Sequence, residues 1–243
     1  MSKYSGLSVL LTGAIDISST PLAIKVSRKQ RINEYLNSIF YMLKKYPSLK
    51  FIYVDSSNFD LMKENKEFKK FKNFESIAFQ GQEIVKQKGK GAGELESIKY
   101  ALKNSDFLLN SKYILKLNGR YILKNLDSMI KNINFIKNEP IILGEFRHYH
   151  NWFDSRCFLA QKLFYRDLIN FEINDFSGIY FEIILARNVN QYLASSKAKW
   201  RMFQRKPKFI GTAGDKGHGL RSNKIRSIIV DFIYRLKNKL VSL

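Results

Sequence analysis

The sequence predicts an α/β fold in which a mostly parallel sheet carries helices on both faces. Apolar runs of strand length alternate along the chain with longer segments in which apolar residues recur at helical spacing. Several of the apolar runs end in small polar residues, which favour a turn at the end of a buried strand. Of the 243 residues, 45% are hydrophobic, which is enough to bury the core of one large domain. Alternating segments of this kind favour a parallel sheet that is covered on both sides.

The chain begins with a strand, a helix and a second strand. The first predicted strand, Leu7 to Leu11, ends at Thr12-Gly13. A helical period starts near Ser27. Its apolar face consists of Ile32, Leu36, Ile39, Phe40 and Leu43. The second strand, Phe51 to Val54, runs into the polar turn Asp55 to Asn58.

The middle of the chain continues this alternation. A weaker strand is predicted at Ser76 to Phe79, and a glycine-containing segment then leads into a helix over Glu94 to Lys103. The strand Tyr113 to Leu117 ends at Asn118-Gly119-Arg120-Tyr121. A helix over about Leu126 to Ile136 precedes the strand Ile141 to Gly144. We expect one domain over residues 1–220 and a separate basic amphipathic helix over residues 221–243.

The ends of the predicted strands indicate where a ligand binds. In open α/β sheets the ligand lies beyond the carboxyl ends of the strands. Those ends place four groups of polar residues at one edge of the sheet. They are Thr12 and Gly13, Asp55 to Asn58, Asn118 to Tyr121, and Glu145 to His150.

The chain is strongly basic, with a formal net charge of +21. Residues 199–243 hold 12 basic side chains against two acidic ones, Asp215 and Asp231, so nearly half of the excess charge lies in the last fifth of the chain. Apolar residues recur there at helical spacing from Ile225 to Leu240, and Ser222 or Asn223 can cap the helix. This helix either docks its apolar face on the domain, lies on an anionic membrane surface, or binds nucleic acid.

A single cysteine, Cys157, excludes an intramolecular disulfide framework and a zinc site built from several cysteines. We therefore expect a reducing compartment, the cytoplasm. The N-terminal apolar run, Leu7 to Leu11, is too short for the core of a signal peptide. No stretch approaches the roughly 20 apolar residues that a membrane span needs. We expect a cytoplasmic protein that reaches the inner membrane peripherally, through the basic C-terminal helix.

The order of these motifs resembles the nucleotide-sugar-binding half of GT-A glycosyltransferases, over about residues 7–190. The segment Phe51 to Asn58 is similar to the second strand of that group, with its acidic end, and the glycine-containing helix start is followed by a strand as in the group. The runs Lys116 to Tyr121 and Trp152 to Arg156 resemble bacterial transferases that build lipopolysaccharide or capsule glycans. The resemblance implies a Rossmann-like fold and sugar transfer from a nucleotide sugar to a lipid-linked or oligosaccharide acceptor.

The resemblance also implies a set of donor-binding residues. Asp55 would hydrogen-bond the nucleoside, and the strand ends and helix start would surround the rest of the donor. The predicted donor-binding residues are Thr12, Gly13, Asp55, Ser57, Lys90, Glu94, Asn118, Arg120 and Arg156.

One departure from the GT-A pattern concerns the metal. Members of that group commonly carry an Asp-x-Asp pair that binds a divalent cation, and this chain has no such pair. Arg120 can neutralise phosphate with paired hydrogen bonds, with help from Lys90 and the amides at the start of the Gly89 to Glu94 helix. We therefore expect no cofactor and no Asp-x-Asp metal, although a divalent metal stays open. The alternative for Arg120 is an ion pair with a structural carboxylate.

Two acids are candidates for the catalytic base that takes the proton of an acceptor hydroxyl. Glu182 lies five residues before Arg187 in a segment that resembles the acceptor-side helix of GT-A enzymes. Asp154 lies in an aromatic segment beside Arg156. Either acid is alternatively a helix cap or an ion-pair partner.

The sequence also suggests roles for the histidines, the aromatic residues and the cysteine of the same region. His148 and His150 share a face in an extended run without a third metal ligand, which favours acceptor contact or exposure over metal binding. Trp152 and Phe153 either stack on a sugar ring or pack in the core. Cys157 has no adjacent base, so we expect a buried structural thiol.

Two other classes of protein compete with a glycosyltransferase. A nucleic-acid-binding protein agrees with the basic charge, but the sequence has neither a zinc-finger spacing nor the aromatic strand signatures of RNA-binding sheets. A dinucleotide enzyme is suggested by Gly89-x-Gly91-x-Gly93. This is not the Gly-x-Gly-x-x-Gly spacing, and Gln82 to Lys88 is too polar for the required strand. We therefore expect no nucleic-acid partner.

Overall fold

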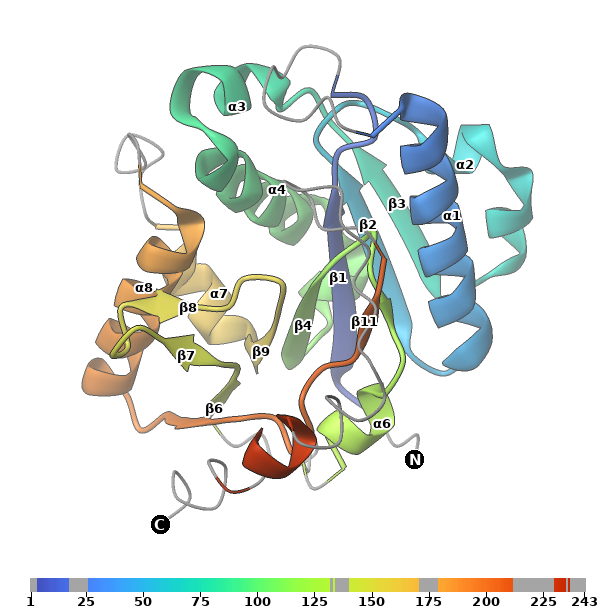
Figure 1. Ribbon diagram of the computed structural model, residues 1–243. Helices are drawn as coiled ribbons and strands as arrows, with labels where there is room; N and C mark the ends of the chain where they lie inside the picture. The colour runs from blue at the N-terminus through green and yellow to red at the C-terminus, as the bar shows by residue number, and fades with distance from the viewer. Residues whose placement is uncertain are drawn as a thin grey trace.

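A mixed sheet forms the centre of the protein in the computed structural model, which describes residues 4–17, 26–131, 133, 140–170, 179–211, 230–234 and 236. Within these residues the sheet has seven strands in the order β10-β6-β9-β4-β1-β2-β3 (Figure 1). The strands are β1 (Leu7–Gly13), β2 (Lys50–Asp55), β3 (Phe74–Ala78), β4 (Tyr113–Asn118), β6 (Ile141–Leu143), β9 (Cys157–Gln161) and β10 (Lys199–Arg201). Of these strands, β9 alone runs antiparallel to its neighbours. The predicted mostly parallel sheet is confirmed.

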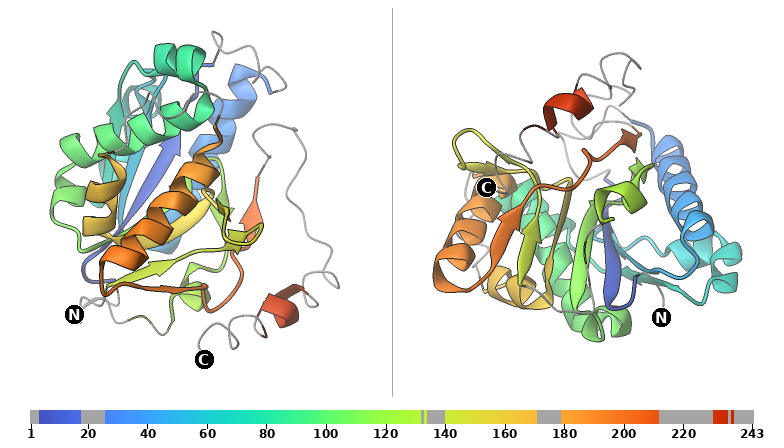
Figure 2. Two further views of the ribbon diagram at one scale, coloured as in Figure 1. Left: turned by 90° about the vertical axis from the view of Figure 1, so that its left-hand side faces the viewer. Right: turned by 90° about the horizontal axis from the view of Figure 1, so that it is seen from below.

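Helices cover both faces of this sheet, as Figures 1 and 2 show. The helical segments with described bounds are α1 (Arg28–Lys45), α2 (Leu61–Glu64), the 3₁₀ helix η2 (Lys66–Lys70), α3 (Gln82–Lys88), α4 (Lys90–Asn104), α5 (Asp106–Leu109), α6 (Leu126–Met129), α7 (Lys162–Leu168) and α8 (Phe181–Ser195). The faces follow from the alternation of side chains along each strand. In β1, Val9 and Leu11 belong to the core cluster that includes α1, whereas Leu10 belongs to the cluster that includes α4, α7 and α8.

Local sequence explains where the helices begin. Ser27 caps α1, because its hydroxyl accepts a hydrogen bond from the amide of Gln30 at 3.2 Å. Gly89 separates α3 from α4 with a φ of 89°, a left-handed conformation that glycine adopts without strain. This break lets α4 start beside the strand ends, where its first turn contributes to the site described below.

Several elements differ from the sequence-based prediction. The strand β9 and the helix α3 were not predicted, and the helix predicted to extend to Ile136 ends as α6 at Met129. An apolar run such as Cys157 to Gln161 does not reveal its direction. A short hairpin, β7 (Phe146–Arg147) and β8 (Trp152–Phe153), reverses the chain and sets that direction. A second small pair, β5 (Ile122–Leu123) with β11 (Phe209–Ile210), brings the chain back beside the end of β4.

The described part of the C-terminal segment is helical at residues 230–234 and 236. Tyr234 is buried against the domain, next to Phe203 and Phe209, and Asp231 forms an ion pair with Lys208 at 2.7 Å. The side chains of Phe232, Ile233 and Leu236 are exposed by 60%, 47% and 47%. The segment thus contacts the domain and presents apolar side chains to solvent. The predicted cap, Ser222 or Asn223, and the boundary at residue 220 lie outside the described residues.

None of the helices within the described ranges is long and apolar enough to cross a membrane.

Candidate active site

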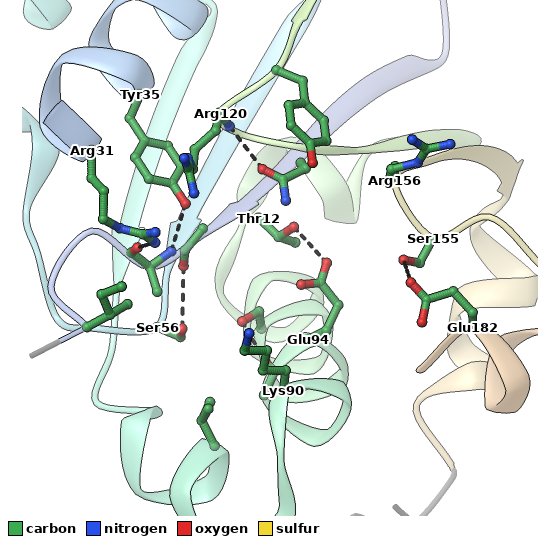
Figure 3. Close-up of a pocket in the computed structure, with 18 of the residues that line it drawn as sticks. Thr12, Arg31, Tyr35, Ser56, Lys90, Glu94, Arg120, Ser155, Arg156 and Glu182 are labelled. Atoms are coloured by element: carbon green, nitrogen blue, oxygen red, sulfur yellow. Dashed lines mark hydrogen bonds between the residues drawn. The ribbon is translucent and has the colours of Figure 1, made fainter. Parts of the chain in front are cut away.

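A cavity of about 480 Å³ lies at the carboxyl edge of the parallel strands, within the size range of small-molecule sites. The ends of β1 and β4 and the start of α4 form its floor, and α1 forms one wall (Figure 3). The opposite wall comes from the residues before β9 and from the start of α8. These residues reach the cavity because β9 is antiparallel, so that its beginning lies beside the end of β4.

Most of the residues predicted from the sequence line this cavity. They are Thr12, Gly13, Lys90, Glu94, Asn118, Arg120, Asp154, Arg156 and Glu182. Asp55 and Ser57 are not among its lining residues. The strand-end rule therefore located the cavity, although Asp55 and Ser57 do not line it.

Asp55 organises the loops beside the cavity and does not face into it, which corrects the expectation that it contacts a nucleoside. Its fully buried carboxylate accepts hydrogen bonds from five donors: the amides of Ile15, Ser57 and Phe59 and the hydroxyls of Ser57 and Tyr53. Burial raises the pKa of Asp55, against the effect of these hydrogen bonds. The Ser57 hydroxyl also accepts from the amide of Asp16 at 2.8 Å. Both side chains thus hold the segment after β1 in place.

Arg120 lies on the cavity wall, but its guanidinium is engaged by a structural partner. Nε donates to Oε2 of Glu34 in α1 at 2.7 Å, and Nη2 lies 2.5 Å from the same oxygen. The Arg120 side chain is 4% exposed and that of Glu34 is 15% exposed. The backbone amide of Arg120 donates to Oδ1 of Asn118 at 3.1 Å. The alternative that pairs Arg120 with a structural carboxylate is therefore the one observed.

Two α1 residues of this wall, Arg31 and Tyr35, were not predicted. Arg31 donates to the backbone carbonyls of Ala14 and Ile15, and the Tyr35 hydroxyl accepts from the amide of Ala14 at 3.1 Å. Gly13 is required by this packing, because a Cβ atom there would lie 2.5 Å from the Tyr35 ring. Arg31 and Tyr35 lie on the buried side of α1. The helical spacing of the sequence does not distinguish such a position from an ordinary core position, so it did not predict these hydrogen bonds.

Glu94 links the floor of the cavity to a buried lysine. Its Oε1 accepts a hydrogen bond from the Thr12 hydroxyl at 2.7 Å and lies 2.5 Å from Nζ of Lys116 in β4. The Lys116 side chain is 2% exposed, and Nζ also donates to the carbonyl of Ser155 at 2.7 Å. Lys116 was not among the predicted site residues. A charged residue within the apolar run Tyr113 to Leu117 is unusual, and this could have marked Lys116 as a functional residue.

The far wall carries an acid that is neutralised and an acid that faces the cavity. Asp154 is bound by Nη2 of Arg156 at 2.5 Å and by Nη2 of Arg147 at 2.9 Å. Burial alone would raise the pKa of Asp154, but its hydrogen bonds to Arg156 and the charges of both arginines lower it. A carboxylate held in this way is a poor proton acceptor, which counts against Asp154 as the base. Glu182, in the first turn of α8, accepts a hydrogen bond from the Ser155 hydroxyl at 2.6 Å.

Cationic side chains outnumber acidic ones in the cavity lining. Arg31, Lys90, Arg120, Arg147 and Arg156 stand against Glu94, Asp154 and Glu182, although Glu34 offsets the charge of Arg120. The N-terminus of α4 adds the partial positive charge of a helix of 15 residues. Such a cavity attracts anionic ligands.

Metal ligands and the thiol were also considered in the sequence analysis. Among the residues that the structure describes, no group of three or more His, Cys, Asp or Glu side chains lies close enough to hold a metal ion. The rings of His148 and His150 have different neighbours, Trp152 and Phe146, respectively. Cys157 is buried, and burial raises the pKa of its thiol.

Solved structures align with this chain at low sequence identity. The inositol-1-phosphate CTP transferase of T. maritima aligns with a TM-score of 0.50 and 11% identity, over 93% of this chain and 94% of that chain. A cytidylyltransferase of Leptospira borgpetersenii has a TM-score of 0.45 and 11% identity, over 97% and 96% of the two chains. A candidate nucleotide-diphospho-sugar transferase of Desulfovibrio desulfuricans G20 has a TM-score of 0.44 and 12% identity, over 81% and 80%.

No protein-family model and no curated protein matches the sequence. The chain shares its fold with the inositol-1-phosphate CTP transferase of T. maritima, and the mostly parallel sheet covered by helices confirms the predicted fold class. At these identities the likeness concerns the fold alone.

Proposed function

We propose that the protein is a glycosyltransferase that moves a sugar from a nucleotide-sugar donor to a lipid-linked or oligosaccharide acceptor in bacterial surface glycan synthesis. The observation that carries this proposal is the cationic cavity at the strand ends, with Glu182 on the wall opposite α1. A nucleotide sugar has a diphosphate that such charges attract and a sugar that extends away from it. The cavity therefore offers cationic groups for the diphosphate and an acid for the transfer step.

The diphosphate would bind between the start of α4 and Arg156. Lys90 is exposed at the cavity rim, and the first amides of α4 have no partner within the helix. Arg156 keeps a firm positive charge, because its hydrogen bonds to Asp154 raise its pKa. Charge neutralisation by these groups supports donor binding without an Asp-x-Asp metal. Loss of turnover in chelator, with rescue by magnesium or manganese, would contradict this part of the proposal.

Glu182 would serve as the base of an inverting transfer. As the acceptor oxygen bonds to the anomeric carbon, the bond from that carbon to the phosphate oxygen breaks. The nucleoside diphosphate leaves with the electron pair, and the acceptor proton passes to the Glu182 carboxylate. The Ser155 hydroxyl orients that carboxylate through its 2.6 Å hydrogen bond. An acid on the cavity wall with an orienting partner has the arrangement that this step requires.

A thermal-shift panel with UDP, GDP, CMP and their sugars tests the donor half, since a ligand that binds only the folded state raises the melting temperature. We expect one nucleotide class to stabilise the protein and its sugar to be consumed with an acceptor. Release of pyrophosphate from a nucleoside triphosphate and a sugar 1-phosphate would instead identify a nucleotidyltransferase. Salt-sensitive oligonucleotide binding without any nucleotide effect would favour the nucleic-acid alternative.

The C-terminal segment would attach the enzyme to an anionic membrane surface on the cytoplasmic side. Phe232, Ile233 and Leu236 are exposed apolar side chains in the most basic part of the sequence, a combination that favours interfacial binding. The contacts of Tyr234 and Asp231 would keep this segment against the domain, on the side where Asp154 and Arg156 lie.

Sedimentation with vesicles tests the membrane part. We expect the wild type to sediment with phosphatidylglycerol vesicles and the double variant Phe232→Ser/Ile233→Ser to stay in solution. Leu163→Ser, at an apolar residue of α7 that is 49% exposed, is the matched control and should still sediment. Equal sedimentation of all three proteins would contradict a role for the segment.

A further inference from the structure

The hairpin of β7 and β8 is fixed to the domain by one set of aromatic side chains. The ring of His150 stacks on Phe146 with centroids 4.4 Å apart, and Trp200 packs edge-on against Phe146 at 5.1 Å. The indole N–H of Trp200 donates to the carbonyl of Gly144 at 3.1 Å. Asn190 of α8 donates to the carbonyl of His150 at 3.3 Å. These contacts anchor the hairpin without Trp152.

Trp152 lies on the other side of the hairpin, at the edge of the cavity. Its ring is 5.5 Å from that of Tyr180, with an angle of 47° between the planes. Tyr180 is the residue that precedes α8, and its side chain is 66% exposed. A large aromatic side chain at this exposure gains little from core packing. The pair therefore forms an open aromatic surface beside Glu182, two residues further along the chain.

We propose that Trp152 and Tyr180 bind the apolar C–H face of a pyranose ring, the acceptor sugar whose hydroxyl Glu182 deprotonates. This inference rests on the proposed glycosyltransferase function. Indole and phenol rings offer rigid apolar area with a polar edge, which matches a sugar ring with C–H groups on its face and hydroxyls at its rim. Ser155, Arg147 and Glu182 line the cavity next to Trp152 and supply polar groups for those hydroxyls.

Saturation-transfer-difference NMR tests this assignment with simple sugars. The probes are the methyl pyranosides of glucose, galactose, mannose and N-acetylglucosamine, measured without nucleotide and with excess UDP, GDP and CMP. We expect saturation of the C–H protons on one face of at least one ring. Tyr180→Ala and Trp152→Ala should weaken this binding about tenfold, and Tyr180→Phe should retain it. Tyr149→Ala is the matched control, because Tyr149 is 99% exposed at the hairpin tip and lies outside the pair.

The outcomes separate this inference from the proposed function. No saturation of any pyranoside by the wild type, or equal binding by Tyr180→Ala, would overturn the acceptor site. Because Tyr180 is exposed, its variant folds even if Trp152→Ala does not, and thermal unfolding checks both. Stabilisation by nucleotides should be the same in Tyr180→Ala as in the wild type. If pyranosides bind through the pair but no nucleotide stabilises the protein, the aromatic site stands and sugar transfer fails.

Discussion

Arg120 and Glu34 form a buried ion pair that joins the end of β4 to α1, with Nε of Arg120 2.7 Å from Oε2 of Glu34. Removing one partner of such a pair leaves an uncompensated charge in a poorly hydrated place. We therefore expect Arg120→Ala to lower the free energy of unfolding by about 3 kcal/mol. Urea unfolding measures this change.

A double-mutant cycle isolates the pair from other effects of Arg120. The double variant Glu34→Ala/Arg120→Ala should be more stable than the sum of the two single changes implies, with a coupling of about 1–3 kcal/mol. Arg187→Ala, at an exposed position of α8, should cost little. Additive single changes would mean that the pair contributes nothing to the fold.

Lys116 is the second buried charge on which the cavity depends. Lys116→Met keeps the length of the side chain but leaves Glu94 without its cation and the Ser155 carbonyl without its donor. We expect a loss of about 3 kcal/mol in the free energy of unfolding. Lys103→Met, at an exposed position of α4, is the control and should change stability by no more than about 0.5 kcal/mol. Equal stability of the two variants would show that the Lys116 pair is dispensable.

Asp154 should make the protein sensitive to acid. Burial raises the pKa of Asp154, but Arg156 and Arg147 outweigh that effect, so its folded pKa lies below the value of about 3.9 for an unfolded aspartate. The carboxylate of Asp154 therefore binds a proton less tightly in the folded chain than in the unfolded chain. Above roughly pH 4 the ionised Asp154 stabilises the fold. This contribution to the free energy of unfolding is lost as the pH falls through the pKa that Asp154 has in the folded protein.

Urea unfolding of Asp154→Asn between about pH 4 and pH 2 checks the sign of this effect. The variant should be less stable than the wild type at neutral pH but should lose less stability over the acid range. Asp106→Asn, at an exposed residue of α5, should follow the wild type. If the free energy of unfolding falls equally with pH in the wild type and in Asp154→Asn, the arginines do not stabilise the ionised carboxylate of Asp154.

Glu182→Gln should abolish transfer while leaving the donor bound. The amide keeps the size of the side chain but cannot take the acceptor proton, so we expect a loss of about 10² to 10⁴ in turnover. Nucleotides should raise the melting temperature of the variant as they do for the wild type. Ser155→Ala should reduce turnover less, because it removes only the orienting hydrogen bond. Undiminished turnover by Glu182→Gln would remove it from the mechanism.

The sequence was most informative where local pattern decides the structure. The apolar runs of β1 and β4 and the cap at Ser27 predicted these elements, because burial and capping depend on neighbouring residues. The direction of β9 was not predictable, since it depends on the hairpin before it. Strand-end polarity located Thr12 and Asn118 in one cavity.

Pairings between distant residues were the part that the sequence did not reveal. Glu34 and Arg120 are separated by 86 positions, and nothing in either neighbourhood marks them as partners. The turn after β2 looks like a ligand site, because the same short polar residues that bind ligands also close loops. Its five protein donors to Asp55 become evident only once the segment after β1 is in place.

The central claim, that the cationic cavity binds a nucleotide, is tested most directly by charge reversal on α4. Lys90 lines the cavity and Lys103 lies near the other end of the same helix, and both are exposed, so Lys90→Glu and Lys103→Glu change the net charge equally without disturbing the core. Isothermal titration with UDP, GDP and CMP should give the same affinity for the wild type and Lys103→Glu, and about tenfold weaker binding for Lys90→Glu. Binding that is equal in all three proteins, or absent from the wild type, would contradict the account.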